Sequence, residues 1–403
     1  MPPGVVKPLD MSILLLVLAI LSVLYWVYAL RSDRRLRDRR GTRSPHAPPV
    51  TVLKPVRGDD GQLYANLRSF CEQDYPHHEV LFGVASADDP AVPVIERLIR
   101  EFPHLDLACV VTSAVTGANR KVNLLEALTR RARHDILVIA DADMRVGPDY
   151  LQTIVGALAD PSVGLVTCLY RGVSAGGLAS SLGAMFINEW FIPAVLVGAR
   201  LGPLRYAFGA TLACRREVLA SIGGFAAVAD YLADDYMIGT LVSRRGLRIA
   251  LAPLVVSNIV VETDLRGLVL HELRWARTFR TVRPLAYACS IVTHGIPLAA
   301  LLLLAAGPTP AAVGLLALHL AIRCSGRVAL YRRLGVPLHW STMGLVPVRD
   351  VLSFILWASS FLGREVCWAG ERFRVDADGR LHPLVPARAV ASQRGAEQTT
   401  GAL

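Results

Sequence analysis

DILVIADAD, at residues 135–143, is the stretch that decides the fold. Its first six residues form a short apolar run typical of a strand buried on both faces, and two carboxylates follow. Similar runs upstream alternate with helical patterns, which predicts an α/β domain with a mostly parallel, Rossmann-like sheet over residues 50–265. The strands are expected at 50–56, 80–86 and 107–111, and the helices at 63–73, 92–102 and 122–131.

Two acids stand at the end of the 135–140 run. Ligands bind at the carboxyl ends of parallel strands, so Asp141 and Asp143 are placed to reach a hard divalent cation, Mg²⁺ or Mn²⁺, and its bound phosphates. Two acids in a solvated turn are the alternative. The position after a buried strand favours the metal-binding interpretation.

Polar residues also follow the neighbouring elements. Asp88 and Asp89 end the second strand segment, and Asn119 and Lys121 lie where the third helix begins. Such groups suit a nucleotide, with carboxylates on base or ribose donors and the cations on phosphates. They are equally compatible with ordinary surface turns.

Another acidic pair, Asp234 and Asp235, precedes an apolar-periodic helix that ends near Gly246. One of these aspartates could simply cap the helix. The functional alternative is a carboxylate base that deprotonates an attacking hydroxyl. Both hold together if Asp234 caps and Asp235 acts as the base.

Farther on, His271, Arg274, Trp275 and Thr278 are spaced at i, i+3, i+4 and i+7, so they share one face of a helix. Arginine suits a diphosphate through its planar fork, and tryptophan at a membrane surface offers a platform for a sugar or lipid. The alternative is an interface anchor with Arg and Trp at headgroup depth.

The N-terminal part is membrane-like. Residues 11–30 form an uncharged apolar run long enough to span a bilayer, so residues 1–30 are predicted to hold a transmembrane helix. RSDRRLRDRRGTR follows at 31–43, which marks that flank as cytoplasmic. A cleaved signal peptide is the alternative. Residues 31–49 are a basic, Pro-rich linker.

Beyond the α/β domain the chain becomes apolar again. Residues 266–284 predict an interfacial amphipathic helix, and 285–330 two transmembrane helices parted by GPTP. Residues 345–368 predict a third membrane or interfacial helix, because Arg349-Asp350 interrupts the run. Residues 369–403 read as a C-terminal tail, expected to be disordered after Pro386.

Composition agrees with a membrane protein. The 403 residues carry a formal net charge of +10, and their mean hydropathy of +0.41 is high for a soluble chain. Arginines cluster beside apolar segments, which points to anionic lipid rather than nucleic acid. The seven cysteines are scattered without zinc-site spacing.

Six short motifs follow one another along the chain. They are KP at 54–55, DDPA at 88–91, GANRKVN at 117–123, DAD at 141–143, ADDY at 233–236 and HELRW at 271–275. Taken in order, these motifs resemble the ceramide glucosyltransferase family, glycosyltransferase family 21. The order is more specific than any one motif, and the similarity covers about residues 50–284. Within the family the chain is most similar to the bacterial hopanoid branch, the bacteriohopanetetrol glucosamine biosynthesis glycosyltransferases.

The resemblance implies a GT-A fold and an inverting single displacement. It assigns Asp235 as the base, Arg274 and Trp275 to a catalytic Arg-Trp motif, and Asp141 and Asp143 to the metal and diphosphate. His271 stands where the family has Gln or Arg, which leaves its role open. The remaining residues that the resemblance assigns to the nucleotide sugar are Lys54, Asp88, Asp89, Asn119, Lys121 and Asp234, with His271.

By the same resemblance the donor would be UDP-N-acetylglucosamine and the acceptor bacteriohopanetetrol. UDP-glucose with ceramide or diacylglycerol is the close alternative. The enzyme would be a multi-pass protein of a bacterial inner membrane with a cytoplasmic catalytic domain. A processive polysaccharide synthase and an inactive lipid-binding scaffold are the rivals; intact Asp141, Asp143 and Asp235 argue against the second.

Overall fold

The computed structural model describes residues 8–32, 47–368 and 370–384, and its α/β domain is built on one eight-stranded sheet. The sheet order is β3-β2-β1-β4-β7-β6-β8-β5. The first four strands pair in parallel, as the sequence predicts. Strands β1 and β2 are buried along their whole length, whereas β3 is the partly exposed edge. They span Val50–Pro55 (β1), His78–Val84 (β2), Asp106–Val111 (β3) and Ile136–Ile139 (β4).

The other half of the sheet is mixed. Strand β7 pairs antiparallel with both β4 and β6, and β6 pairs parallel with β8 over a long, bulged register. The short β5 adds an antiparallel edge to β8. This half brings residues after position 200 beside the carboxyl end of β4. The strands are Met144–Arg145 (β5), Val163–Ser174 (β6), Leu212–Arg215 (β7) and Arg248–Val260 (β8).

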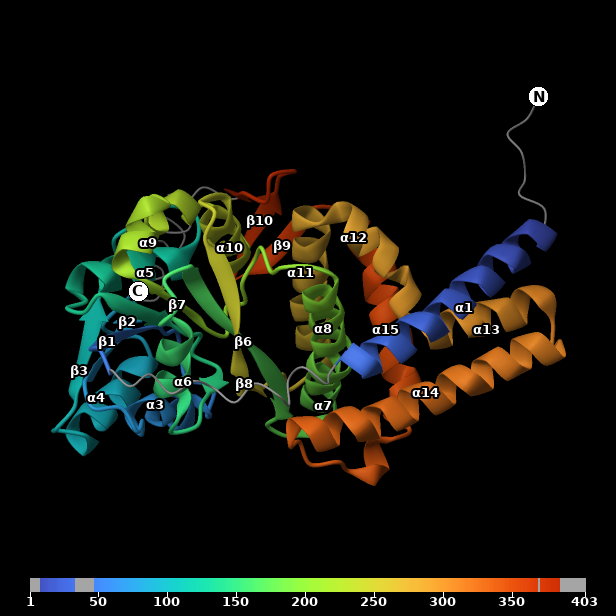
Figure 1. Ribbon diagram of the computed structural model, residues 1–403, viewed down its shortest axis with the longest axis horizontal. Coiled ribbons are helices and arrows are strands. Elements are labelled where there is room, and N and C mark those ends of the chain that lie inside the picture. The colour runs from blue at the N-terminus through green and yellow to red at the C-terminus, as the bar shows by residue number, and fades with distance from the viewer. Residues whose placement is uncertain (1–7, 33–46, 369, 385–403) are drawn as a thin grey trace, which may run out of the picture.

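Helices cover both faces of the sheet and form two apolar cores. One core joins the sheet to α3, α4 and α6, and the other joins it to α5, α9, η2 and α10 (Figure 1). Inward side chains of β1, such as Val52 and Leu53, alternate between the two cores. The helices are Leu63–Cys71 (α3), Ala91–Glu101 (α4), Arg120–Arg131 (α5), Tyr150–Ala157 (α6), Arg216–Ser221 (α9), Phe225–Val228 (η2) and Asp234–Arg244 (α10).

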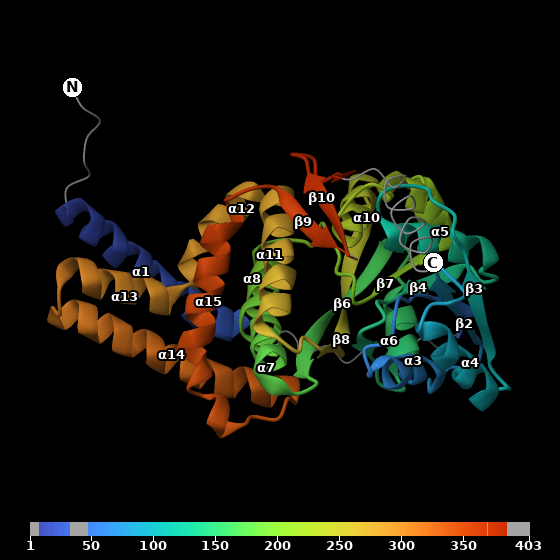
Figure 2. The same ribbon diagram turned by 180° about the vertical axis from the view of Figure 1, so that it is seen from behind.

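Apolar helices project from one side of this domain (Figures 1 and 2). Helix α1 (Pro8–Ser32) contains the predicted first span. Of the two spans predicted at 285–330, the second is α14 (Pro310–Leu334), but the first is broken. Its two halves are bent by 68° relative to each other, with the break at His294. The halves are α12 with η3 (Pro284–Cys289 and Ser290–Thr293) and α13 (Gly295–Ala306).

A further layer of helices lies between the sheet and the projecting helices. It consists of α7, α8, α11 and α15 (Leu345–Ser360), which run across the direction of α1 and α14 in Figure 1. The predicted interfacial helix is α11 (Leu265–Val282). The helices between 177 and 201 were not predicted from the sequence. They are apolar enough to span a membrane, but 72% of that stretch is buried inside the protein. They are α7 (Gly177–Phe186), the π-helix η1 (Ile187–Phe191) and α8 (Ile192–Leu201).

Helix α15 (Leu345–Ser360) connects this layer to α14 through its central Arg349-Asp350 pair. Arg349 donates two bonds to the Glu272 carboxylate of α11, at 2.8 and 2.6 Å. Asp350 accepts from Arg323 of α14 at 2.7 and 2.8 Å. All four side chains are buried. The charges that interrupt the apolar run therefore hold two neighbouring helices. A short 3₁₀ turn, η4 (Trp340–Thr342), precedes α15.

The predictions for 345–368 as a helix and for 369–403 as a tail are wrong in part. Residues from 365 form a three-stranded sheet of β9 (Glu365–Trp368), β10 (Glu371–Val375) and β11 (Leu381–Pro383). Val366, Phe373 and Leu381 pack on Leu232, so these strands form a small folded sheet where the end of a helix and the start of a tail were predicted. The tail after Pro386 and most of the 31–49 linker lie outside the described residues.

Candidate active site

Asp141 lies directly beyond β4, held by two lysines. Lys121 Nζ, from the first turn of α5, lies 2.6 Å from Asp141 Oδ1. Lys54 Nζ, at the end of β1, donates to the Asp141 carbonyl at 2.6 Å and sits 3.8 Å over the Phe70 ring. Burial lowers the Lys54 pKa to about 7, although Asp141 and Asp143 oppose that shift. The two lysines fix the turn that carries the acids.

Asp143 is partly buried, and one of its carboxylate oxygens is buried without a partner. Asn258 of β8 donates to its Oδ2 at 2.7 Å, whereas Oδ1 has no hydrogen-bond partner. Burial, with Asp141 nearby, raises the Asp143 pKa to about 6. A buried, unpartnered carboxylate oxygen is costly, and a cation would offset the cost. Within the described ranges no group of three acidic, His or Cys side chains could hold a metal by itself.

The second acidic pair opens α10. Asp234 is its first residue, but the cap position is Ala233 and no side chain caps the helix, so the capping alternative is wrong. Asp234 Oδ2 instead faces Lys121 Nζ at 3.4 Å. Asp235 accepts the amide N–H of Gly209 on Oδ2 at 2.6 Å and of Tyr236 on Oδ1 at 2.7 Å. Burial, followed by the charge of Asp234, raises the Asp235 pKa to about 6.

Gly209, just before β7, lies between the two acidic groups and was not predicted as a site residue. A Cβ at this position would lie 2.8 Å from Asp141 Oδ2 and 3.3 Å from Asp235 Oδ2. A glycine therefore lets both carboxylates approach one point. No sequence motif marked it, because its requirement arises from a contact between segments about 70 and 26 residues away in the chain.

Helix α11 supplies the basic and aromatic side of the site. Burial lowers the Arg274 pKa to about 10, against the opposing charges of Asp141 and Asp143. The His271 ring lies edge-on to Trp275 with centroids 4.4 Å apart, and its Nδ1 lies 2.5 Å from Glu262 Oε1. Glu262, which was also not predicted as a site residue, therefore orients His271. His271 is the residue that departs from the Gln or Arg of the family motif.

The remaining predicted residues differ in placement. Asp89 lines the site and accepts the amides of Gly58 and Ala91 at 2.7 and 2.9 Å. Asp88 is exposed and outside the cavity wall. Asn119 is fully buried, caps α5 through Val122 and donates to the Tyr231 carbonyl at 2.8 Å. Lys54 is also buried behind the wall. Asn119 and Lys54 thus support the site from behind.

One continuous cavity of about 2440 Å³ contains the site. Asp141, Asp143, Asp235 and Arg274 all line it, so the structure brings together acids and a cation predicted from separate stretches. Its wall extends from Asp89 to Tyr25 of α1. The cavity therefore joins the carboxyl end of the sheet to the helices that project from the domain.

The C-terminal sheet closes part of this cavity with Trp368, Arg372 and Phe373. It also fastens three segments of the site. Glu371 pairs with Arg120 beside Lys121, and Arg277 of α11 donates to the Glu365 carbonyl. The Leu381 amide donates to the Asp230 carbonyl at 2.7 Å, shortly before the acidic pair of α10.

Comparison with known proteins identifies a family and several relatives that this chain resembles. Residues 14–381 match the model of a family described as Glycosyl transferase family 21. Ceramide glucosyltransferase 1 of Caenorhabditis elegans is 28% identical over 57% of this chain and 50% of its own length. Ceramide glucosyltransferase of Komagataella phaffii is 30% identical over 39% and 32%, respectively. The chain thus spans half or less of these relatives.

A solved structure is similar over most of the chain. A mannosyltransferase from Pyrobaculum calidifontis, in complex with GDP-Man and Mn²⁺, has a TM-score of 0.55 at 24% identity and covers 87% of this chain and 99% of its own. The similarity confirms the predicted GT-A-type fold, a mostly parallel sheet accompanied by apolar helices.

Proposed function

Because the chain belongs to Glycosyl transferase family 21, we propose that it transfers a sugar from a UDP-sugar to a lipid hydroxyl at a membrane surface. One observation carries the proposal. Asp141 and Asp235 approach the same point across Gly209 inside a cavity that reaches the apolar helices. Donor and acceptor can therefore meet where a lipid is accessible.

The proposed reaction is an inverting displacement. The lipid hydroxyl oxygen attacks the anomeric carbon, the bond from that carbon to the diphosphate oxygen breaks, and the hydroxyl proton passes to Asp235. Arg274 and Lys121 stabilise the charge on the leaving UDP. One base is enough for this inversion. Asp89 would contact the nucleoside and Trp275, packed 5.8 Å from Phe186, the sugar or lipid.

The relatives favour glucose and a ceramide-like acceptor, because those reported above carry the name ceramide glucosyltransferase. Diacylglycerol stays the other acceptor of this alternative. N-acetylglucosamine and bacteriohopanetetrol, expected from the hopanoid branch, stay predictions. We place the catalytic domain on the cytoplasmic side of a multi-pass membrane protein. The arginine-rich segment after residue 30 supports this topology, as do the candidate spans α1 and α14 and the bent pair of α12–η3 with α13.

The residues present fit a divalent cation only together with the donor. Asp143, with its unpartnered Oδ1, and Asp141 would hold Mg²⁺ or Mn²⁺, and the diphosphate would complete the ligands. The ion would supply positive charge to the departing diphosphate.

Chelation of divalent cations is accordingly expected to abolish transfer, and Mn²⁺ or Mg²⁺ to restore it. Because UDP provides the missing ligands, Mn²⁺ should bind tightly only with UDP present, as measured by electron paramagnetic resonance. Asp143→Asn should weaken this binding at least about tenfold, since it removes a charged ligand. Unchanged UDP-dependent Mn²⁺ binding in that variant would contradict the assignment.

The function itself is tested by supplying the full chain in membranes with separately labelled UDP-glucose and UDP-N-acetylglucosamine, together with ceramide, diacylglycerol or bacteriohopanetetrol. Mass spectrometry of the lipid extract is expected to show a single hexose on ceramide or diacylglycerol. An N-acetylhexosamine on the hopanoid would support the other branch. A polymeric product would favour a polysaccharide synthase, and no product with any pair would refute the proposal.

A further inference from the structure

The cavity has an apolar arm that leads from Asp235 towards the projecting helices. Its wall includes Ala194 and Val197 of α8, Ala286 and Tyr287 of α12, and Tyr25 of α1. The arm is lined by described residues from 190–206 and from 278–293. Of these lining residues, only Arg205 and Arg283 are charged. An arm of this composition suits hydrocarbon better than a nucleotide.

One wall of the arm begins at the proposed base. Tyr236, the neighbour of Asp235, stacks on Tyr206 with centroids 5.6 Å apart, and Tyr206 lies 5.7 Å from Phe208. Phe208 in turn meets Phe191 of η1 at 5.2 Å. A continuous row of rings therefore runs from α10 to the start of α8.

A second row begins at Trp275 and passes through Phe186 to Trp190, whose rings stack at 5.0 Å. Trp190 donates to Thr293 Oγ1 at 2.8 Å, and Trp26 of α1 donates to the Thr293 carbonyl at 3.2 Å. The second row thus ends at η3 and at α1, which is a candidate membrane span, whereas the first row ends at the start of α8.

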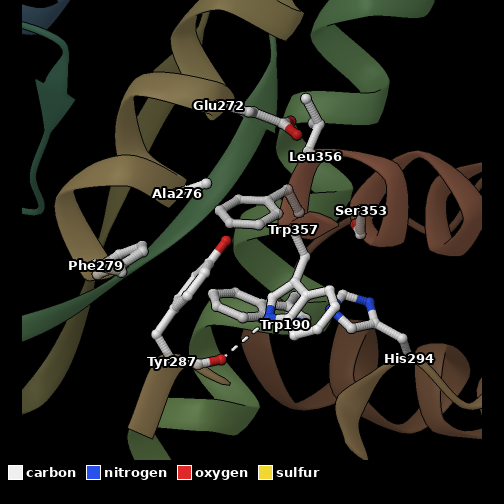
Figure 3. A pocket seen from close by; sticks show the side chains of 10 residues that line it. Trp190, Glu272, Ala276, Phe279, Tyr287, His294, Ser353, Leu356 and Trp357 are labelled. Atoms are coloured by element: carbon white, nitrogen blue, oxygen red, sulfur yellow. Dashed lines mark hydrogen bonds between the residues drawn. The ribbon is translucent and has the colours of Figure 1, made fainter. Parts of the chain in front are cut away.

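The second row is supported from behind, as Figure 3 shows. Trp190, Phe279 and Tyr287 line the arm and also a separate cavity of about 20 Å³, which has room for about one water molecule. The Trp357 indole donates to the Tyr287 carbonyl at 3.0 Å. The rings of Trp190, Phe279 and Tyr287 therefore separate the arm from this smaller cavity.

The rim of the arm is apolar and open. Leu201, at the end of α8, is 74% exposed, and Leu285, at the start of α12, is 77% exposed. Leu201 itself lines the arm, and Leu285 precedes the lining residue Ala286. Large exposed leucines next to candidate spans are expected to face lipid.

We propose that this arm binds the hydrocarbon chain of the acceptor, which enters from the bilayer between α8 and α12 and presents its hydroxyl to Asp235. This inference rests on the proposed function and adds a route and a selectivity. Acceptors with a chain long enough to fill the arm should be preferred, because each buried methylene improves binding about fourfold.

The test compares acceptors of long and short acyl chain with the variant Ala194→Phe in the full-length protein. Ala194 is half-buried and faces the arm, so a phenyl group would displace about two methylenes of a bound chain. Transfer to the long-chain acceptor should fall about 15-fold in kcat/KM, because two methylenes at about fourfold each are lost. Transfer to a six-carbon acyl analogue should change less than about twofold.

Ala199→Phe is the matched control, because Ala199 is on the same helix and does not line the cavity. It should leave both rates unchanged. Equal loss with both acceptors in Ala194→Phe, or an unchanged ratio, would overturn the arm as the acceptor site and indicate a structural lipid instead. If the unmodified protein glycosylates no lipid of either length, the proposed function fails rather than the route.

Discussion

Asp235→Asn is expected to lower the rate of sugar transfer by about 10²–10⁴-fold, because an amide cannot accept the proton of the attacking hydroxyl. Gly209 and Tyr236 donate to different oxygens of Asp235, so the single amide oxygen of Asn keeps one of these two bonds. The fold should survive the loss of the other, which is expected to cost about 1–3 kcal/mol. UDP binding should also persist. The measurement is turnover of labelled donor with a lipid acceptor, alongside UDP affinity.

The same base predicts a pH dependence. Its pKa is raised to about 6 by burial and by Asp234, and only the ionised carboxylate accepts a proton. kcat/KM should therefore fall as pH decreases through about 6 and level off above it. Asp160→Asn, in an exposed pair with Arg248, is the control and should retain activity. Full activity of Asp235→Asn would refute its role.

Asp350→Ala is expected to cost about 3–5 kcal/mol in the free energy of unfolding. In this variant Glu189 is the one carboxylate that still pairs with the buried Arg323 and Arg327. One positive charge is therefore left uncompensated. Thermal or denaturant unfolding of the protein in detergent micelles measures the loss.

The control for charge balance is the double variant Arg323→Met, Asp350→Leu. It leaves Glu189 with Arg327 at 3.1 Å and replaces the removed pair with apolar side chains. Its free energy of unfolding should therefore be at least about 2 kcal/mol higher than that of Asp350→Ala. Equal destabilisation by both would show that packing, rather than the unpaired charge, determines the stability of this junction.

The parts of the molecule that follow from local pattern were predictable. Buried strands such as β1 and β2 and the acids after β4 come from periodicity and position alone. The antiparallel β7 was not found, because its four residues have no periodic signal and its partners lie far away in the chain. Nor does hydropathy distinguish a span from α7 and α8, which the protein itself covers.

The candidate site divides in the same way. Asp141, Asp143 and Asp235 could be nominated because each stands at an element boundary. Gly209 and Glu262 could not, since each matters through a contact that only the fold creates. Asn119 was predicted to bind the nucleotide sugar because amide side chains are suited to that. In the structure its side chain instead caps α5 and donates to the Tyr231 carbonyl.

The fastening of the C-terminal sheet has a consequence for synthesis. A chain emerges from the ribosome in order, and its early domains fold first. Residues 365–383 follow every candidate span within the described residues, yet they hold the segments that carry Lys121, Asp234 and Arg274. A nascent chain would therefore enter the membrane with its catalytic groups still loosely arranged, and would become competent only when this last sheet closes over them.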